Sequence, residues 1–336
     1  MEAPVLLIFF NRPKVLEESF GWIRRVKPAR LFLAQDGPRE SCPEDMGKIL
    51  ACRRVVEDID WECEVHKNYS EKNLSCDERE FTAISWCFEF VDRLIVLEDD
   101  CRPSDSFYPF CGELLERYRE NQRIQLISGF NRCNIYDGYP YDYVFSTASA
   151  GIGWATWRRV WEEVQKLQER KEWDSGFLDL YGKIIDSNSM KILRGTVGQI
   201  PERKRLDVQE GKVHAWEFWV GLDMLLQDRL SVTPARNMVK YLGVAEGATH
   251  SANCPELMIG RVRRVLLQSA YETEGPLKHP PLIVRDRVFE QRDYEAFWRE
   301  RPFLERMESL LLKLRYKRGE LVRQSLGRWF RKGKRG

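Results

Sequence analysis

The sequence predicts an α/β protein in which helices flank a mainly parallel β-sheet. Short apolar runs alternate with longer amphipathic segments between residues 5 and 128. Strands separated by helices of about a dozen residues form right-handed βαβ units, which place neighbouring strands parallel. Polar side chains also follow directly after several apolar runs. This is typical of sheets whose ligands bind beyond the carboxyl ends of the strands.

The predicted elements alternate strictly through the first part of the chain. The apolar run at 5–10 is typical of a buried strand, and Asn11-Arg12-Pro13 follows it. Pro13 suits the first turn of a helix, because the N–H that it lacks would have no partner there. The expected strands are 5–10, 30–35, 62–66, 94–97 and 124–128, and the expected helices are 13–26, 46–59, 76–91 and 107–118.

From Asn131 onward the alternation is less regular. A segment of small residues at 148–154 precedes a predicted helix. The expected strands are 141–146, 230–233 and 238–242, and the expected helices are 155–167 and 216–226. No Gly-x-Gly-x-x-Gly follows the first strand and no Gly-x-x-x-x-Gly-Lys occurs, so a Rossmann dinucleotide site and a P-loop are both disfavoured.

Composition limits the class of protein. The chain has 336 residues, 43% of them hydrophobic, which is enough for one large domain or two small ones with a real core. No apolar run is long enough to span a bilayer, and residues 1–10 lack the basic flank and cleavage site of a signal peptide. The nine cysteines, without a Cys-x-x-Cys pair, suggest neither a disulfide framework nor a zinc site. We therefore expect a cytoplasmic protein.

The C-terminal end is strongly basic. Residues 313–335 hold ten Lys or Arg against one acid, a balance of +9 in a chain of net charge +2, so the remainder carries −7. This argues against nucleic-acid binding by the body and for an anionic partner of the tail. Apolar residues recur there at helical spacing: Phe303, Met307, Leu310, Leu311, Leu314, Leu321, Val322, Leu326, Trp329 and Phe330. Residues 303–335 are predicted to lie on an anionic membrane surface, or alternatively to pack on the body with a solvated basic face.

Three adjacent carboxylates, Glu98, Asp99 and Asp100, follow the apolar run at 94–97. They repel one another, so two interpretations stay open: a solvated turn, or a cluster neutralised by a cation. Mn²⁺ or Mg²⁺ takes oxygen ligands, typically one or two carboxylates together with substrate phosphates. His250 is either a further ligand or a hydrogen-bonded loop residue.

Seven segments carry a resemblance to a known family. They occur in the order PVLLIFFNRP, AQDGP, VLEDDCRPSDSFYPFCGELLERY, ISGFN, ASAGIGWATWRRVW, AWEFW and NMVKYLGVAEGATHS. Over about residues 4–251 the chain resembles glycosyltransferases of the GT-A (Rossmann-like) fold. It is most similar to bacterial haemolytic-protein-like sugar transferases and, more distantly, to the N-acetylglucosaminyltransferase I group.

The resemblance implies a nucleotide-sugar site at the strand ends. By this resemblance, Glu98 and Asp99 would face the ribose, and Asp100 and His250 would hold the metal. Asn11 and Arg12 would line the donor pocket, with Arg12 near phosphate, and Asp36 would bind the base.

The resemblance also implies an acceptor side and a base. Gly151 and Gly153 would lie beneath the bound acceptor, where glycine lets the backbone approach a sugar closely. The alternative is that turn geometry alone requires these two glycines. Trp154, with Trp157 and Trp216, is expected to stack on sugar faces, or to belong to the core.

An inverting transfer needs a base for the acceptor hydroxyl. Glu217 is predicted to be that base, because its apolar neighbours would raise its pKa. The alternatives are a partly exposed helix glutamate without this role, a base shifted to the slot that Phe218 occupies, and Asp223.

Two positions depart from the family pattern. Relatives have a glycine and a basic residue after Asn-Leu, where this chain has Ser75 and Asp77. These changes affect the segment that faces the donor.

The expected organisation is a domain at 1–285, with a nucleotide-binding half (1–133) and an acceptor half (134–285), followed by a basic helical tail at 286–336. The expected function is a metal-dependent, inverting glycosyltransferase. It would move a sugar from a UDP-sugar to a glycan or lipid-linked acceptor in the synthesis of a cell-surface polysaccharide such as lipopolysaccharide. A sugar-phosphate nucleotidyltransferase and a catalytically degraded nucleotide-sugar-binding protein remain alternatives.

Overall fold

One mixed β-sheet organises the chain. The computed structural model describes residues 3–148, 150–169, 216–244, 258–299 and 303–312. The strand order is β3-β2-β1-β4-β8-β6-β9-β7; all strands run in one direction except β8 and β7. The strands are β1 (Val5–Phe9), β2 (Arg30–Gln35), β3 (Glu64–Tyr69), β4 (Arg93–Glu98), β6 (Ile124–Ser128), β7 (Tyr143–Ser146), β8 (Trp154–Trp157) and β9 (Leu230–Pro234). The expected α/β class with a mainly parallel sheet is confirmed.

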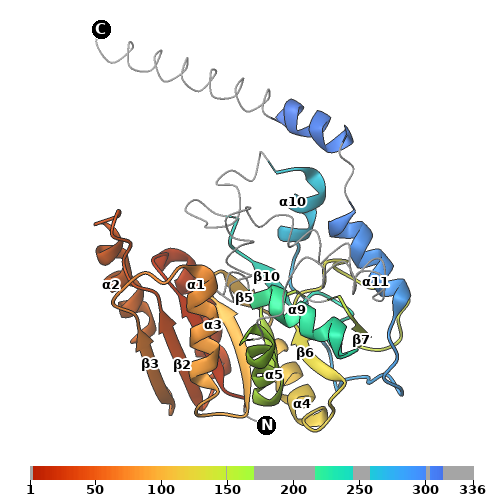
Figure 1. Cartoon of the computed structure of the whole chain (residues 1–336), viewed down its shortest axis with the longest axis horizontal. Helices are drawn as coiled ribbons and strands as arrows, with labels where there is room; N and C mark the ends of the chain where they lie inside the picture. Colours follow the sequence, from red (N-terminus) through yellow and green to blue (C-terminus); the bar gives the residue numbers. More distant parts are fainter. Residues whose placement is uncertain (1–2, 149, 170–215, 245–257, 300–302, 313–336) are drawn as a thin grey trace.

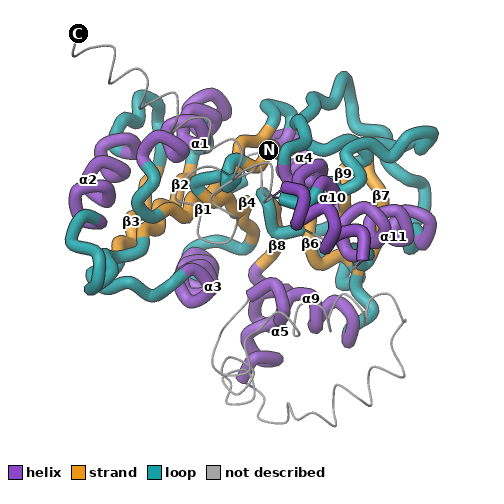
Figure 2. Tube along the Cα trace, turned by 90° about the horizontal axis from the view of Figure 1, so that it is seen from above, coloured by secondary structure: helices purple, strands orange, loops and turns teal. Residues whose placement is uncertain are grey.

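Helices cover both faces of this sheet. In Figure 2, α1 and α4 lie on one side of the strands and α3, α5 and α9 on the other. The helices are α1 (Pro13–Val26), α2 (Asp45–Val56), α3 (Cys76–Cys87), α4 (Phe107–Arg117), α5 (Arg158–Glu169), α9 (Trp216–Leu226), α10 (Gly260–Leu266) and α11 (Arg287–Asp293). Because both faces are covered, strands such as β1 and β6 are buried along their whole length, as continuous apolar runs require.

Two short elements differ from expectation. The helix predicted at 155–167 begins only at Arg158, because Trp154–Trp157 forms β8, an antiparallel strand between β4 and β6. The residue pattern Trp-Ala-Thr-Trp fits either a strand or the start of a helix. Pairing with β4 and β6 makes this segment a strand. The second is β5 (Cys101–Pro103), which pairs with β10 (Val239–Tyr241) in a separate two-stranded sheet.

The segment after residue 285 is not a uniform tail. Asp286 caps α11 by accepting from the N–H groups of Val288 and Phe289, and Phe289 is fully buried. A π-helix, η2 (Tyr294–Trp298), follows directly. Residues 286–298 thus pack on the body, whereas residues 303–312 form a helix that Figure 1 shows beyond α10, away from the sheet. Residues 313–336 lie outside the described residues.

A membrane-spanning helix was also sought. None of the helices in the described ranges has the length and hydropathy that crossing a bilayer requires.

Candidate active site

Glu98, the last residue of β4, is half-buried, and the two aspartates that follow it lie in a turn that is not solvated. Asp99 and Asp100 are only 3% and 4% exposed. The guanidinium of Arg12, which follows β1, donates to Asp99 and, over 2.9 Å, to Oδ2 of Asp100. The cation that neutralises these carboxylates is therefore an arginine from the neighbouring strand end. We call Arg12, Glu98, Asp99 and Asp100 the strand-end cluster.

The strand-end cluster still carries more negative than positive charge. Burial raises the pKa of Asp99 to about 6, although Arg12 acts to lower it. Burial also raises the pKa of Glu98 well above its ordinary value, and the charges of Glu80, Asp100 and Glu217 raise it further.

The carboxylates of Asp99 and Asp100 are oxygen ligands of the type that divalent cations take, but Arg12 donates to both oxygens of Asp99 and to Oδ2 of Asp100, so a metal here stays a prediction. Within the described ranges no three His, Cys, Asp or Glu side chains gather as a ligand set. Mg²⁺ and Mn²⁺ need fewer when substrate phosphates complete the coordination. Gly243 packs closely against Asp100, since a Cβ there would stand 2.4 Å from Oδ2 of Asp100. His250, the second predicted ligand, lies outside the described residues.

Asp36, at the end of β2, anchors the segment before α3. Its Oδ2 accepts from Nδ2 of Asn73 and its Oδ1 from the N–H of Leu74, each at 2.9 Å. Burial raises the pKa of Asp36, and hydrogen bonds from the backbone N–H groups of Leu74 and Gly37 oppose the rise. The predicted role in base recognition stays a prediction; what the structure shows is an organiser of the loop at 73–75.

Ser75 holds a backbone conformation normally reserved for glycine. Its φ is 70° and its ψ is 164°, a region that costs an L-residue free energy. Arg79, one turn into α3, is buried, and its charge acts on the carboxylate of Asp36.

Asn11 contacts α2 rather than the strand-end cluster. Its Nδ2 donates to Oδ1 of Asp45 over 2.7 Å, and Asp45 also accepts from Arg39. Arg39 and Asn11 together lower the pKa of Asp45 to about 2. Asn11 thus ties the end of β1 to α2 beside the predicted donor site.

Glu217 is solvent accessible on α9 and lines a cavity of about 350 Å³, which we call the α9 cavity. Surrounding protein atoms desolvate its carboxylate and raise its pKa to about 7. Asp223, the alternative base, is buried in an ion pair with Arg229 at 2.7 Å. Phe218 is also buried. Among the candidates on α9, Glu217 alone is an accessible carboxylate.

Glu80 was missed from the sequence. It lies on α3, nearly buried, and accepts from Nε1 of Trp216 and from Sγ of Cys76. Burial, followed by the charge of Glu217, raises its pKa to about 8. A glutamate on the buried face of a predicted helix, next to Phe81, is the signal that could have found it.

Steric limits favour glycine at positions 151 and 153, whereas Trp154 packs in the core. A Cβ at Gly151 would stand 2.7 Å from the ring of Trp216, and Gly153 has a φ of +64°. Trp154 is 1% exposed and its ring stacks on Trp216 at 4.7 Å. Trp154 and Trp157 both lie in the core through β8, as in the alternative that the sequence left open. Trp216 does line the α9 cavity.

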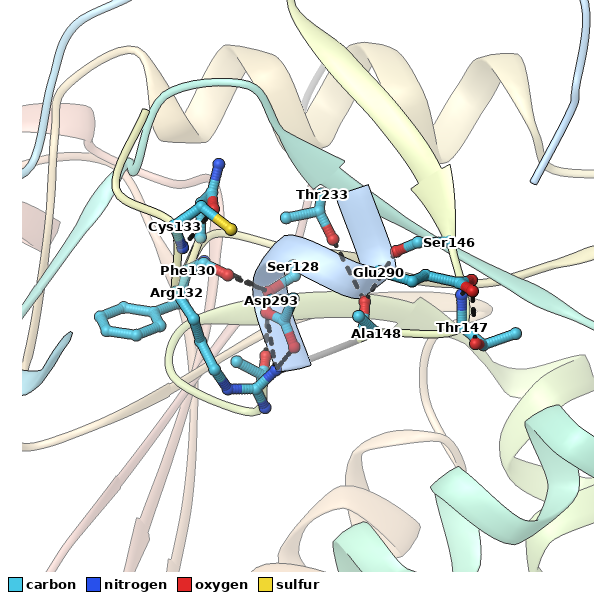
Figure 3. A network of polar contacts seen from close by, with 12 residues as sticks. Ser128, Phe130, Arg132, Cys133, Ser146, Thr147, Ala148, Thr233, Glu290 and Asp293 are labelled. Carbon is cyan, nitrogen blue, oxygen red and sulfur yellow. Dashed lines mark hydrogen bonds and ion pairs between the residues drawn. The ribbon is translucent and has the colours of Figure 1, made fainter. Parts of the chain in front are cut away.

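A polar network holds the walls of this cavity (Figure 3). Hydroxyls of Ser146 and Ser231 donate to the carbonyl of Ala148 over 3.0 and 2.7 Å. From the C-terminal segment, Glu290 accepts from the N–H and hydroxyl of Thr147. The loop that leads to Gly151 is thus fixed from both sides.

Comparison with known proteins gives distant likeness only. No protein-family model and no curated protein sequence matches the chain. Among solved structures, 4-diphosphocytidyl-2C-methyl-D-erythritol synthase from Anaerococcus prevotii is 11% identical, with a TM-score of 0.31 over 53% of this chain and 84% of that one. A putative glucose-1-phosphate thymidylyltransferase from Bacillus anthracis is 10% identical, with a TM-score of 0.30 over 49% and 75%. Mouse xyloside xylosyltransferase 1 is 11% identical, with a TM-score of 0.26 over 40% and 55%. Likeness at this level does not identify an activity.

Proposed function

We propose that the chain is a metal-dependent, inverting glycosyltransferase of the GT-A type. It would transfer a sugar from a UDP-sugar to a glycan or lipid-linked acceptor in the synthesis of a cell-surface glycan. One observation carries the proposal: Glu217 is close enough to Glu98, in the strand-end cluster, for its charge to raise the pKa of that carboxyl. In the proposal, Glu217 supplies the base, and the carboxylates of the strand-end cluster supply the side that takes a metal-bound diphosphate.

The proposed reaction is a single displacement. The acceptor hydroxyl gives its proton to the Glu217 carboxylate, and its oxygen forms a bond to the anomeric carbon of the donor. The bond from that carbon to the phosphate oxygen breaks, and its electron pair leaves with UDP. A pKa of about 7 suits Glu217 as a general base near neutral pH.

The donor side would be held by the strand ends. Asp100, with Asp99 beside it and His250 as a further ligand, would hold Mn²⁺ or Mg²⁺. When bound, the ion neutralises diphosphate charge as a Lewis acid. Glu98, Asn11, Arg12 and Asp36 would surround the ribose, the phosphates and the base.

Binding of UDP is the first test. We expect the melting temperature to rise with UDP and Mn²⁺ together, and to rise less with either alone. A ligand at about a hundred times its Kd adds roughly 2.7 kcal/mol of stability. No shift under any of these conditions would overturn the proposal. Release of pyrophosphate from UTP and a sugar phosphate would instead favour the nucleotidyltransferase.

The base assignment has its own test. Glu217→Gln is expected to lower turnover by about 10²- to 10⁴-fold, because general base catalysis contributes on that scale. The UDP-dependent shift in melting temperature should persist, because Glu217 lies outside the donor ligands. Glu162→Gln, an exposed change on α5, is the matched control. Full turnover in Glu217→Gln would show that another group removes the proton.

We also propose that residues 303–335 bind an anionic membrane surface. The helix at 303–312 turns Glu305 and Glu308 toward α10, where they accept from Arg261 and Gly260. Its apolar side chains are exposed: Phe303, Leu304, Met307, Leu310 and Leu311. The balance of +9 in residues 313–335 complements anionic lipid.

Vesicle sedimentation tests this surface. We expect binding to vesicles of phosphatidylcholine with one third phosphatidylglycerol, weaker binding to phosphatidylcholine alone, and loss of binding in Phe303→Asp/Leu310→Asp. Leu282→Asp changes an equally exposed leucine elsewhere and should bind as the unmodified protein does. Equal binding by all three proteins, or by none, would refute the membrane role.

A further inference from the structure

The lining of the α9 cavity is mainly apolar. Ile152, Trp216, Val220, Val265 and Phe297 are among the side chains around it, and they come from four segments: the loop before β8, α9, α10 and η2. Among the described residues that line it, Arg132 is the only basic one. Its charge is compensated by Asp293, whose carboxylate oxygens lie 3.1 and 3.2 Å away. The cavity therefore suits an uncharged, apolar group.

Gly221 leaves room beside the predicted base. Glu217, Gly221 and Leu225 all line the cavity and follow at four-residue spacing, so they share one face of α9. Apart from its chain neighbours and the backbone of its own helix, a Cβ at Gly221 would meet no heavy atom of the described residues within 4 Å. Glycine inside a helix costs about 0.5–1 kcal/mol relative to alanine. No packing contact with the described residues requires glycine here, and the missing side chain leaves space next to Glu217.

The opposite wall is an aromatic pair on η2. The guanidinium of Arg132 lies over the rings of Phe297 and Trp298, at 5.7 and 5.3 Å from their centroids. Asp293, at the start of this π-helix, fixes the same guanidinium from the other side. π-Helical turns are rare and frequent at functional sites. Residues 286–298 thus complete the cavity rather than only cover the body.

We propose that the α9 cavity binds the apolar part of the acceptor, an alkyl or aryl group attached to the moiety whose hydroxyl faces Glu217. Gly221 determines this specificity, because any larger residue would fill the space that the apolar group occupies. The inference rests on the proposed function and names the class of acceptor for the same site.

Binding of two matched glycosides tests the inference. The probes are octyl β-D-glucopyranoside, kept below its micelle concentration, and methyl β-D-glucopyranoside, measured by titration calorimetry. The octyl compound should bind at least tenfold more tightly, because each buried methylene group contributes favourably. In Gly221→Leu this preference should fall at least tenfold. Equal binding of the two glycosides, or unchanged preference in Gly221→Leu, would overturn the inference.

A matched variant separates cavity filling from a general effect. Gly47→Leu adds the same side chain to α2, again with no heavy atom within 4 Å of the new Cβ, and should bind as the unmodified protein does. Leucine favours helix over glycine, so both variants should fold. Phe297→Ala, which removes one wall, should also weaken octyl binding; its failure to do so would contradict the proposal even if Gly221→Leu did not fold.

The UDP measurement distinguishes the two proposals. Gly221→Leu should keep the metal-dependent UDP shift, since Gly221 lies outside the strand-end cluster. If UDP shifts the melting temperature but the octyl preference is absent, only the inference fails. If the octyl preference depends on Gly221 but UDP has no effect, the cavity stands as an apolar-ligand site and the glycosyltransferase proposal fails.

Discussion

At the carboxyl ends of β1 and β4, charged side chains are held by one another, whereas the α9 cavity is framed by apolar and aromatic packing. Arg12 neutralises Asp99 and Asp100 within the strand-end cluster. The side chains that line the cavity with Glu217 are mainly apolar, and Gly221 adds no side chain beside it. The difference shows how one site can hold a charged donor on one side and an apolar acceptor on the other.

The two regions also differ in how their walls are assembled. The strand-end cluster depends on the sheet, since β1 pairs directly with β4. The cavity depends on residues 285–298, which reach back to Thr147 and Arg132 through Glu290 and Asp293. Changes in one region should therefore leave the other largely intact, and the following variants test that independence.

The largest effect is expected for Arg12→Ala. It would leave two adjacent buried carboxylates without their cation, and removing one partner of a buried ion pair costs about 3–5 kcal/mol. Urea denaturation measures the loss. Arg25→Ala, which breaks an exposed pair with Asp105, should cost at most about 1 kcal/mol. Similar losses in both variants would mean that the strand-end cluster contributes little to stability.

Phe289→Ala should destabilise the cavity side by a comparable or slightly smaller amount. The side chain is fully buried, and truncating a buried phenylalanine costs about 3–5 kcal/mol. We expect lower thermal stability and weaker octyl glucoside binding, with the metal-dependent UDP shift retained. Val288→Ala, on the exposed side of α11, serves as the control. Loss of the UDP-dependent shift in melting temperature in Phe289→Ala would show that the two regions are not independent.

Glu80 should make stability fall as pH rises. Its pKa in the folded protein is about 8, above the ordinary value of 4.5, so the folded state binds a proton that the unfolded chain releases. Between about pH 4.5 and 8 this contribution to the free energy of unfolding decreases. Glu80→Gln should flatten the decline of melting temperature between pH 5.5 and 8, whereas the exposed change Glu78→Gln should not. Identical slopes would mean that Glu80 is ionised in the folded protein.

The smallest expected effect is a gain. Ser75→Gly should stabilise the protein by about 1 kcal/mol, because glycine adopts φ 70° and ψ 164° without the strain of an L-residue. Ser75→Ala keeps the strain and should give no gain. Differential scanning calorimetry of the three proteins measures this difference. A gain in Ser75→Ala would assign the effect to the hydroxyl instead of the backbone.

The sheet was largely predictable because it depends on local pattern. Apolar runs and helical periods between residues 5 and 128 gave the order of elements, and polar residues after the runs indicated where the strand ends meet. The site was only partly predictable. The acidic run and Arg12 were both identified, but the sequence could not show that they pair with each other.

What the sequence missed depends on contacts between distant segments. Glu80 is notable only because Trp216 and Glu217 approach it. Gly221 is notable only because the space in front of it is empty. The segment at 286–298 has an amphipathic composition that fits a tail, and only its contacts with Arg132 and Thr147 assign it to the body. The donor, metal and membrane assignments remain predictions.

The place of β1 in the sheet has a consequence for folding during synthesis. β1 lies between β2 and β4, and its partner residues Val5 and Ile95 are far apart in the chain. One edge of this wholly apolar strand therefore stays unpaired until residues 93–98 have left the ribosome. Unpaired apolar edges promote association between chains, and contacts of long sequence separation form slowly. The nascent chain is thus most prone to aggregate before the acidic run that completes the strand-end cluster has been made.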